Sequence, residues 1–140
     1  MKYIKTGSDY IIRIDRGEEI LTCLESLAEK EDIRLGSFSG LGAADRVKIG
    51  IFLTDIRQYK SEVYTGDFEI ASLFGTVSRK DGKPYLHCHA TIGNITKGET
   101  YAGHLSEARI SGTCEISLRK LEGEAGRLFD EETGLTILDI

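Results

Sequence analysis

Two of the chain's three histidines lie one residue apart, within the stretch PYLHCHATIG at residues 84–93. Successive side chains of a β-strand point to opposite faces of the sheet, so His87 and His89 would share one face while Cys88 points to the other. The Cα atoms of such a pair lie about 7 Å apart, close enough for both imidazoles to reach one ion. The spacing therefore predicts paired imidazoles on a polar face and assigns Cys88 to the core.

The third histidine, His104, follows His89 after 14 intervening residues, in the stretch TYAGHLSE. A turn between residues 93 and 98 would fold this segment back beside the first, so that all three imidazoles meet. Three histidine ligands with an open fourth position are typical of a metal that exchanges ligands, since structural zinc sites are closed. The sequence thus predicts a metal site of His87, His89 and His104, with zinc as the expected ion, although imidazole also suits nickel and iron. A solvated histidine pair and a hydrogen-bonded cluster without metal stay open as alternatives.

Three other kinds of site fit the sequence less well. The histidine pair of cupins is followed by a glutamate and a Pro-x-Gly motif, and both are absent here. The stretch GSFSGLGAAD lacks the lysine and third glycine of nucleotide-binding loops, so we expect a tight turn or close backbone packing there. It also departs from the G-x-S-x-G nucleophile elbow, which leaves a triad built on Ser37 or Ser39 open but unsupported. Candidate general bases are Glu99, Glu107 and Glu115, and the sequence identifies no catalytic residue.

The apolar pattern predicts the elements that must position the histidines. In the stretch GEEILTCLESLAEK, one apolar stripe at helical spacing is formed by Ile20, Cys23, Leu24 and Leu27. The phase of FEIASLFGTVS breaks between Ile70 and Leu73, which indicates a bulge or a strand covered on both faces. Asp81-Gly82 indicates a hairpin turn, and RLFDEE indicates a single helical turn.

Strands are predicted over residues 10–14, 46–53, 68–78, 84–93, 109–121 and 134–140, with one more around His104. We therefore expect an α+β domain with one main helix and a mostly antiparallel sheet of about seven strands.

Composition and charge exclude several classes of protein. The 140 residues include 18 Lys and Arg against 23 Asp and Glu, and this net charge of −5 argues against a broad phosphate-binding surface. No apolar run approaches the ~20 residues that a membrane span needs, and no secretion signal is visible, so we expect a cytoplasmic protein that does not enter membranes. Three cysteines without CxxC spacing favour reduced core thiols over a disulfide framework.

The order of four motifs resembles a known family. The stretches GSFSGLGA, GDFEIASLFGTV, YLHCHATIG and AGHL occur as in the PPC domain (plants and prokaryotes conserved), formerly a domain of unknown function. The resemblance implies a single PPC-like domain over residues 1–140, with an α+β fold, a seven-stranded antiparallel sheet and assembly into a homotrimer. It also implies a three-histidine cluster that falls on His87, His89 and His104. One departure is Ala102, where many relatives carry a second glycine.

The resemblance leaves two functions in competition. Plant members carry an AT-hook with an Arg-Gly-Arg-Pro core, which this chain lacks. Prokaryotic relatives are described as predicted DNA-binding proteins, but the net charge of −5 leads us to expect no sequence-specific DNA binding by this chain. The favoured function is a homotrimer whose metal site binds or processes a small molecule. The alternative is a non-catalytic assembly module or a DNA-binding regulatory module, in which the histidine cluster is structural. The sequence names neither a substrate nor a reaction.

Overall fold

The computed structural model describes residues 1–140 and contains one helix and eight strands, all of whose pairings are antiparallel. The predicted class, with one helix and a mostly antiparallel sheet, is therefore confirmed, while the number of strands is eight, where about seven were expected. The elements are β1 (Lys2–Thr6), β2 (Asp9–Asp15), α1 (Ile20–Lys30), β3 (Gly36–Leu53), β4 (Gln58–Lys80), β5 (Lys83–Asn94), β6 (Glu99–Lys120), β7 (Gly126–Asp130) and β8 (Leu135–Asp139).

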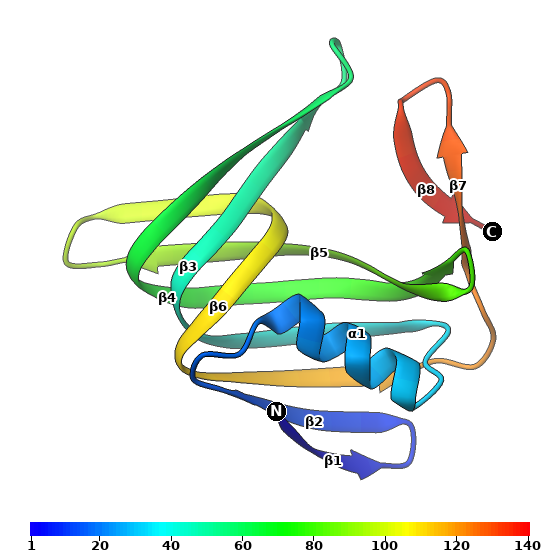
Figure 1. The fold of residues 1–140 in the computed structure, drawn as a ribbon, viewed down its shortest axis with the longest axis horizontal. Helices are drawn as coiled ribbons and strands as arrows, with labels where there is room; N and C mark the ends of the chain where they lie inside the picture. The colour runs from blue at the N-terminus through cyan, green and yellow to red at the C-terminus, as the bar shows by residue number, and fades with distance from the viewer.

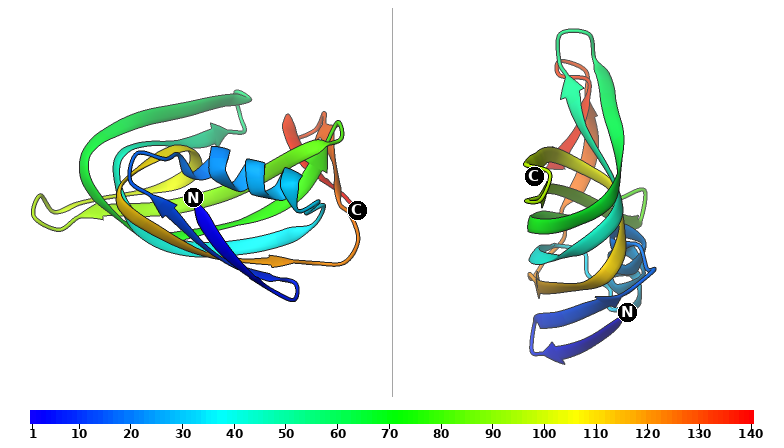
Figure 2. Two further views of the ribbon diagram at one scale, coloured as in Figure 1. Left: turned by 60° about the horizontal axis from the view of Figure 1, so that its bottom comes forward. Right: turned by 90° about the vertical axis from the view of Figure 1, so that its left-hand side faces the viewer.

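Six strands form one sheet in the order β1-β2-β6-β3-β4-β5, while β7 and β8 form a separate hairpin (Figure 1). The first residues of β6 also pair with β5, so β3, β4, β5 and β6 form a closed ring of paired strands. The ring is strongly curled, and α1 lies along one side of it (Figure 2). The core between helix and sheet includes the buried residues Ile14, Leu24, Leu73, Ile92 and Ile116.

The helix begins at Ile20, later than the first residue of the predicted stretch, because Glu19 caps it. The Glu19 carboxylate accepts hydrogen bonds from the backbone N–H groups of Leu21 and Thr22, at 3.0 and 2.8 Å. The apolar stripe faces the core as predicted, except that Cys23 is only half-buried and Ala28 takes a buried place beside Leu27. No helix in the chain has the length and apolar character needed to cross a membrane.

The two longest strands are β4 and β6. Register shifts typical of bulges interrupt their pairing, and each of them pairs with more than one neighbouring strand. The break in phase between Ile70 and Leu73 corresponds to a register shift in the pairing of β4 with β5, as the sequence indicated. The predicted turn at Asp81-Gly82 joins these two strands, and both of its residues have positive φ angles, 53° and 77°. These two local signals were therefore interpreted correctly.

Two local predictions were only partly correct. The stretch GSFSGLGAAD forms the first half of β3, so of the two expected alternatives close backbone packing occurs there and a tight turn does not. A Cβ atom added to Gly40 or Gly42 would lie 2.5 or 2.6 Å from a β6 carbonyl oxygen, so these glycines allow close strand packing. The stretch RLFDEE is mostly strand, and the one helix-like hydrogen bond, from the Gly134 N–H to the Asp130 carbonyl oxygen at 2.8 Å, lies at its acidic end. Its first residues form β7, and its acidic end forms the β7–β8 turn, where the Asp130 carboxylate accepts a hydrogen bond from the Thr133 N–H at 3.0 Å.

Candidate metal centre

Strand β5 places two of the three histidines on its outer face. Cys88, Ala90 and Ile92 alternate with them and are buried, with exposed fractions of 2, 3 and 0%. His87 and His89 are exposed on the opposite face, as the alternation predicted. The Cys88 side chain therefore points away from the imidazoles, and burial raises the pKa of its thiol to about 12. A neutral, buried thiol at this position is a packing residue and not a ligand.

The β5–β6 hairpin brings the third histidine to the first two. Its turn lies between Asn94 and Glu99, and the antiparallel register then pairs His89 directly with His104. The ring centroids are 5.7 Å apart for this pair, and His87 lies 5.4 Å from each of the two. One nitrogen from each imidazole lies within 4.8 Å of the others. The structure thus brings together the three histidines that the sequence selected.

Two glycines make room around His104. A Cβ atom on Gly103 would lie 2.6 Å from the Gly50 carbonyl oxygen, so only glycine lets β6 approach β3 this closely beside the histidine. Gly50 in turn lies beneath the Tyr59 ring, whose Cε1 would be 3.2 Å from an added Cβ. The Tyr59 ring meets the imidazole of His104 edge-on at 5.3 Å between centroids. These contacts leave His104 half-buried and fix the direction of its ring.

The electrostatics of the cluster favour neutral imidazoles. Burial, followed by the neighbouring histidines, lowers the pKa of His104 to about 4. Burial and the positive charge of Arg127 also lower the pKa of His87. Neutral imidazole is the form that ligates metals. Two bonds of about 2.1 Å in a tetrahedral zinc site place ligand atoms roughly 3.4 Å apart, so nitrogens that lie within 4.8 Å of one another must move closer by about 1 Å to share one ion. Three neutral nitrogen donors therefore fit a borderline ion such as zinc.

A cavity of about 460 Å³ opens beside the cluster, and His87 and His104 line it. Its lining includes residues of two hairpins. These two hairpins extend from the same side of the sheet (Figure 1). The β3–β4 hairpin contributes Phe52 and Tyr59, while the β7–β8 hairpin contributes residues 134–138. The tips of the two hairpins are joined, because Nη2 of Arg57 donates a hydrogen bond to the Glu132 carbonyl oxygen at 3.1 Å. The histidines therefore face a built cleft whose volume suits a small ligand.

Arg127 on β7 lines the same cavity, although it was not predicted from the sequence as a site residue. The guanidinium lies over the Tyr85 ring, 4.7 Å from its centroid. No sequence signal pointed to this residue, because it lies in the stretch that was interpreted as a helical turn. Its place beside the histidines depends entirely on how the β7–β8 hairpin docks against β4.

The other residues considered from the sequence lie outside this cavity. Its lining contains no carboxylate, so Glu99, Glu107 and Glu115 have no place in it. Glu107 instead accepts a hydrogen bond from Nε of Arg46 at 2.7 Å. Ser37 shares a surface hollow with His87 and His89, but no hydrogen bond joins its hydroxyl to an imidazole. The arrangement therefore supports ligation and not a serine-based triad.

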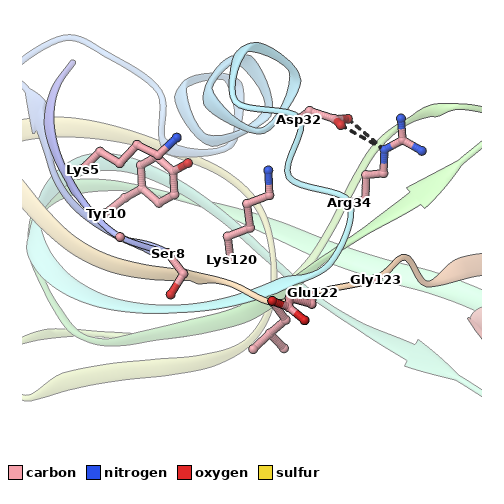
Figure 3. Close-up of a pocket in the computed structure, with 10 residues that line it drawn as sticks. Lys5, Ser8, Tyr10, Asp32, Arg34, Lys120, Glu122 and Gly123 are labelled. Atoms are coloured by element: carbon pink, nitrogen blue, oxygen red, sulfur yellow. Dashed lines mark hydrogen bonds and ion pairs between the residues drawn. The ribbon is translucent and has the colours of Figure 1, made fainter.

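A second cavity, of about 540 Å³, lies near the N-terminal strands and contains several cations (Figure 3). Their donor groups already have partners within the protein. Arg34 bonds to Asp32 through Nε at 2.9 Å, and Nζ of Lys5 donates to the Glu31 carboxylate at 2.8 Å. Nζ of Lys120 donates to the Glu31 carbonyl oxygen at 2.9 Å. With its donors satisfied internally, this cavity is a weaker candidate for ligand binding than the one beside the histidines.

Comparisons with known proteins agree with this architecture. The family model of the Plants and Prokaryotes Conserved (PCC) domain matches residues 1–122. A metal-containing protein from Archaeoglobus fulgidus superposes with a TM-score of 0.88 at 34% identity, over 95% of this chain and 94% of that one. A plant- and prokaryote-conserved (PPC) protein from Pyrococcus horikoshii also gives a TM-score of 0.88 at 34% identity, over 99% and 95% of the two chains. A candidate DNA-binding protein from Bacteroides thetaiotaomicron gives 0.94 at 29% identity, over 99% and 96%. A search of curated proteins gave no significant match.

Proposed function

Since this chain belongs to the Plants and Prokaryotes Conserved domain family, we propose that it binds a zinc ion through His87, His89 and His104 beside a cleft for a small molecule. The observation that carries the proposal is the convergence of three imidazole nitrogens to within 4.8 Å of one another at the edge of a cavity. The Archaeoglobus fulgidus relative, described as metal-containing, supports it. When bound, such an ion supplies Lewis-acid chemistry at its open position. The chain's own contribution is to hold the imidazoles in register and to shield His104 beneath Tyr59.

We propose further that the domain spans residues 1–140 and assembles as a homotrimer. Solved relatives align over 99% of the chain, which supports extending the domain beyond the matched residues 1–122 to include β7 and β8. Exposed apolar side chains on the central strands support assembly. Leu41 is 56% exposed and Phe74 is 58% exposed, and burying them against another subunit would remove apolar surface from water.

The second candidate is a non-catalytic module that acts in DNA-bound regulation, with the histidine cluster in a structural role. It is favoured by two structural relatives described as candidate DNA-binding proteins, at 29 and 30% identity. The cavity beside the histidines favours the first candidate, because a purely structural metal site is closed and has no need of an open cleft.

The metal site is tested by measuring zinc affinity by competition with a chelator, using wild-type protein and the His89→Ala variant. Thr91→Ala is a matched control, since Thr91 lies two residues further along the same face of β5. We expect His89→Ala to weaken zinc binding by at least about tenfold and Thr91→Ala to leave it unchanged.

Zinc should also be released as the pH falls, because protons compete for imidazole nitrogens. A wild-type affinity no greater than that of His89→Ala would overturn the proposal. If His89→Ala also dissociated the oligomer, the structural role would be favoured instead.

A further inference from the structure

The Arg127 guanidinium is held in place by the protein, yet part of it has no partner. Its Nε donates to the Ser78 hydroxyl at 2.9 Å, and Nη1 reaches the Thr136 carbonyl oxygen at 3.5 Å. The Nη2 atom is buried and makes no hydrogen bond. No ion pair in the structure includes Arg127. Burial lowers the pKa of Arg127, but the guanidinium keeps its charge at neutral pH.

An unpartnered buried donor is unfavourable, and it is rare in folded proteins unless it has a role. Another arginine of this chain, Arg79, also has one unpartnered buried nitrogen, its Nε, but its charge is neutralised. Arg79, which is 7% exposed, forms ion pairs with Glu29 at 2.8 Å and Asp32 at 3.3 Å, and Arg127 has no such pair. No acidic side chain lines the cavity around Arg127, even though the chain as a whole carries a net charge of −5. The cavity therefore contains a fixed positive charge that the protein itself does not neutralise.

We infer that this cavity binds an organic anion of carboxylate or phosphate type, whose charged group pairs with Arg127 and whose body lies beside the histidine cluster. Arginine presents its N–H groups in a planar fork that matches the oxygens of carboxylates and phosphates. The remaining walls are largely apolar and suit the body of such a molecule; they include Phe52, Leu135, Ile137 and Leu138. His87 and His104 line the same cavity, so one small molecule can contact Arg127 and face the metal site together.

This inference deepens the proposed function and rests on it for the contact at the metal site. The pairing with Arg127 itself needs no metal, because the guanidinium is positioned by Ser78, Thr136 and Tyr85. Failure of the metal site and failure of the anion site are therefore separable. Each can be measured with the other left intact.

The experiment uses phenylacetate as the probe, with phenylacetamide as its uncharged counterpart and inorganic phosphate as a second anion. Binding is measured by calorimetry on full-length protein, both freed of metal and loaded with zinc. The variants are Arg127→Gln, which removes the charge, and Arg127→Lys, which keeps it. Arg119→Gln is the control, since Arg119 is an exposed arginine on β6 that does not line the cavity. Circular dichroism and zinc affinity establish that each variant is folded and retains the metal site.

We expect wild-type protein and Arg119→Gln to bind phenylacetate in both metal states, and to bind phenylacetamide roughly tenfold or more weakly. Arg127→Gln should lose a similar factor for phenylacetate while keeping its zinc affinity, and Arg127→Lys should recover part of the loss. Binding of phosphate in place of phenylacetate, with the same dependence on Arg127, would assign the site to phosphorylated ligands. The inference is overturned if folded wild-type protein binds neither anion, or if Arg127→Gln binds them as well as Arg119→Gln does. A lack of zinc affinity in wild-type protein would instead count against the metal site.

Discussion

His89 on β5 and His104 on β6 are direct partners in the antiparallel ladder, with ring centroids 5.7 Å apart. His87 lies two residues along the same face of β5 and completes the cluster at 5.4 Å from each ring. The spacing of the three imidazoles is therefore fixed by strand register, which backbone hydrogen bonds maintain. Changes to backbone packing should disturb this site as much as changes to its side chains.

Replacing Cys88 with serine should leave zinc affinity unchanged. The Cys88 side chain lies on the core face of β5, and its Sγ is 4.0 Å from the Leu105 carbonyl oxygen. Placing a hydroxyl in this apolar position should lower the free energy of unfolding by about 1–3 kcal/mol. Chelator competition and urea denaturation measure the two quantities. A loss of zinc affinity as large as that of His89→Ala would show that the thiolate is a ligand.

Replacing Gly103 with alanine should damage both stability and the metal site. The new Cβ would lie 2.6 Å from the Gly50 carbonyl oxygen, so β6 must move away from β3 next to His104. We expect a loss of about 1–3 kcal/mol in the free energy of unfolding, together with weaker zinc binding. Gly112→Ala on the same strand is the control, because its nearest neighbour, the Ala43 Cβ, would be 3.6 Å away. Equal effects of the two substitutions in urea denaturation would contradict this account of Gly103.

Glu31 should make stability depend on pH in the acid range. Hydrogen bonds from Lys5, Tyr3 and Tyr10 lower the pKa of Glu31 from 4.5 to about 2. Between these two values the unfolded chain binds the proton more readily, so the contribution of Glu31 is present above pH 4.5 and is lost as the pH falls toward 2. Urea denaturation across this range should show a smaller loss for Glu31→Gln than for wild-type protein. Glu122→Gln, at an exposed residue, should follow the wild type. A Glu31→Gln profile that coincides with the wild type would refute the assignment.

The oligomeric state should depend on the apolar patch formed by Leu41 and Phe74. Light scattering at micromolar concentration should give about three times the chain mass of 15.5 kDa for wild-type protein. Leu41→Asp places a charge in the patch, so it should shift the protein toward smaller species without unfolding it. Ser61→Asp is a suitable control at an exposed position in the far half of β4. A wild-type mass of 15.5 kDa would eliminate the homotrimer.

The chain alone should not bind short DNA duplexes tightly. Its net charge is −5, and phosphate contacts by lysine and arginine supply most of the affinity of DNA-binding proteins. Fluorescence anisotropy at about 0.15 M salt should therefore show no complex in the range typical of specific binding, ~10⁻⁸ M or tighter. A complex of that affinity would favour the regulatory alternative over the small-molecule cleft.

Local patterns in the sequence were sufficient to find the metal-site candidate. The alternation around Cys88 assigned both faces of β5 correctly, and the turn between residues 93 and 98 placed His104 opposite His89. Both signals depend on neighbours in sequence, which is why they could be interpreted without a structure. Arg127 lies on a hairpin with no pairing to the main sheet, so only docking of that hairpin brings it to the cavity.

Long-range contacts explain what the sequence left open or missed. The glycines of GSFSGLGAAD suited either a turn or close packing, and close packing occurs because β6 packs against Gly40 and Gly42 from 70 or more residues away in sequence. The short strand β1 was not predicted, since its five residues carry exposed side chains at four positions and show no clear alternation. Tertiary contacts decide the structure at these places, and composition alone does not reveal them.

The central place of β6 also determines when the sheet can be completed during synthesis. This strand bonds to β2, β3 and β5, and its pairs include Asp9 with Arg119 and Gly36 with Lys120. As the ribosome makes the chain from the N-terminus, β2 and β3 emerge long before the strand that joins them. Their shared neighbour is the last element of the main sheet to be translated. The sheet therefore closes late and in order: residues 104–110 of β6 can pair with the second half of β3 first, and β2 has no partner on its inner edge until residues 113–119 have left the ribosome.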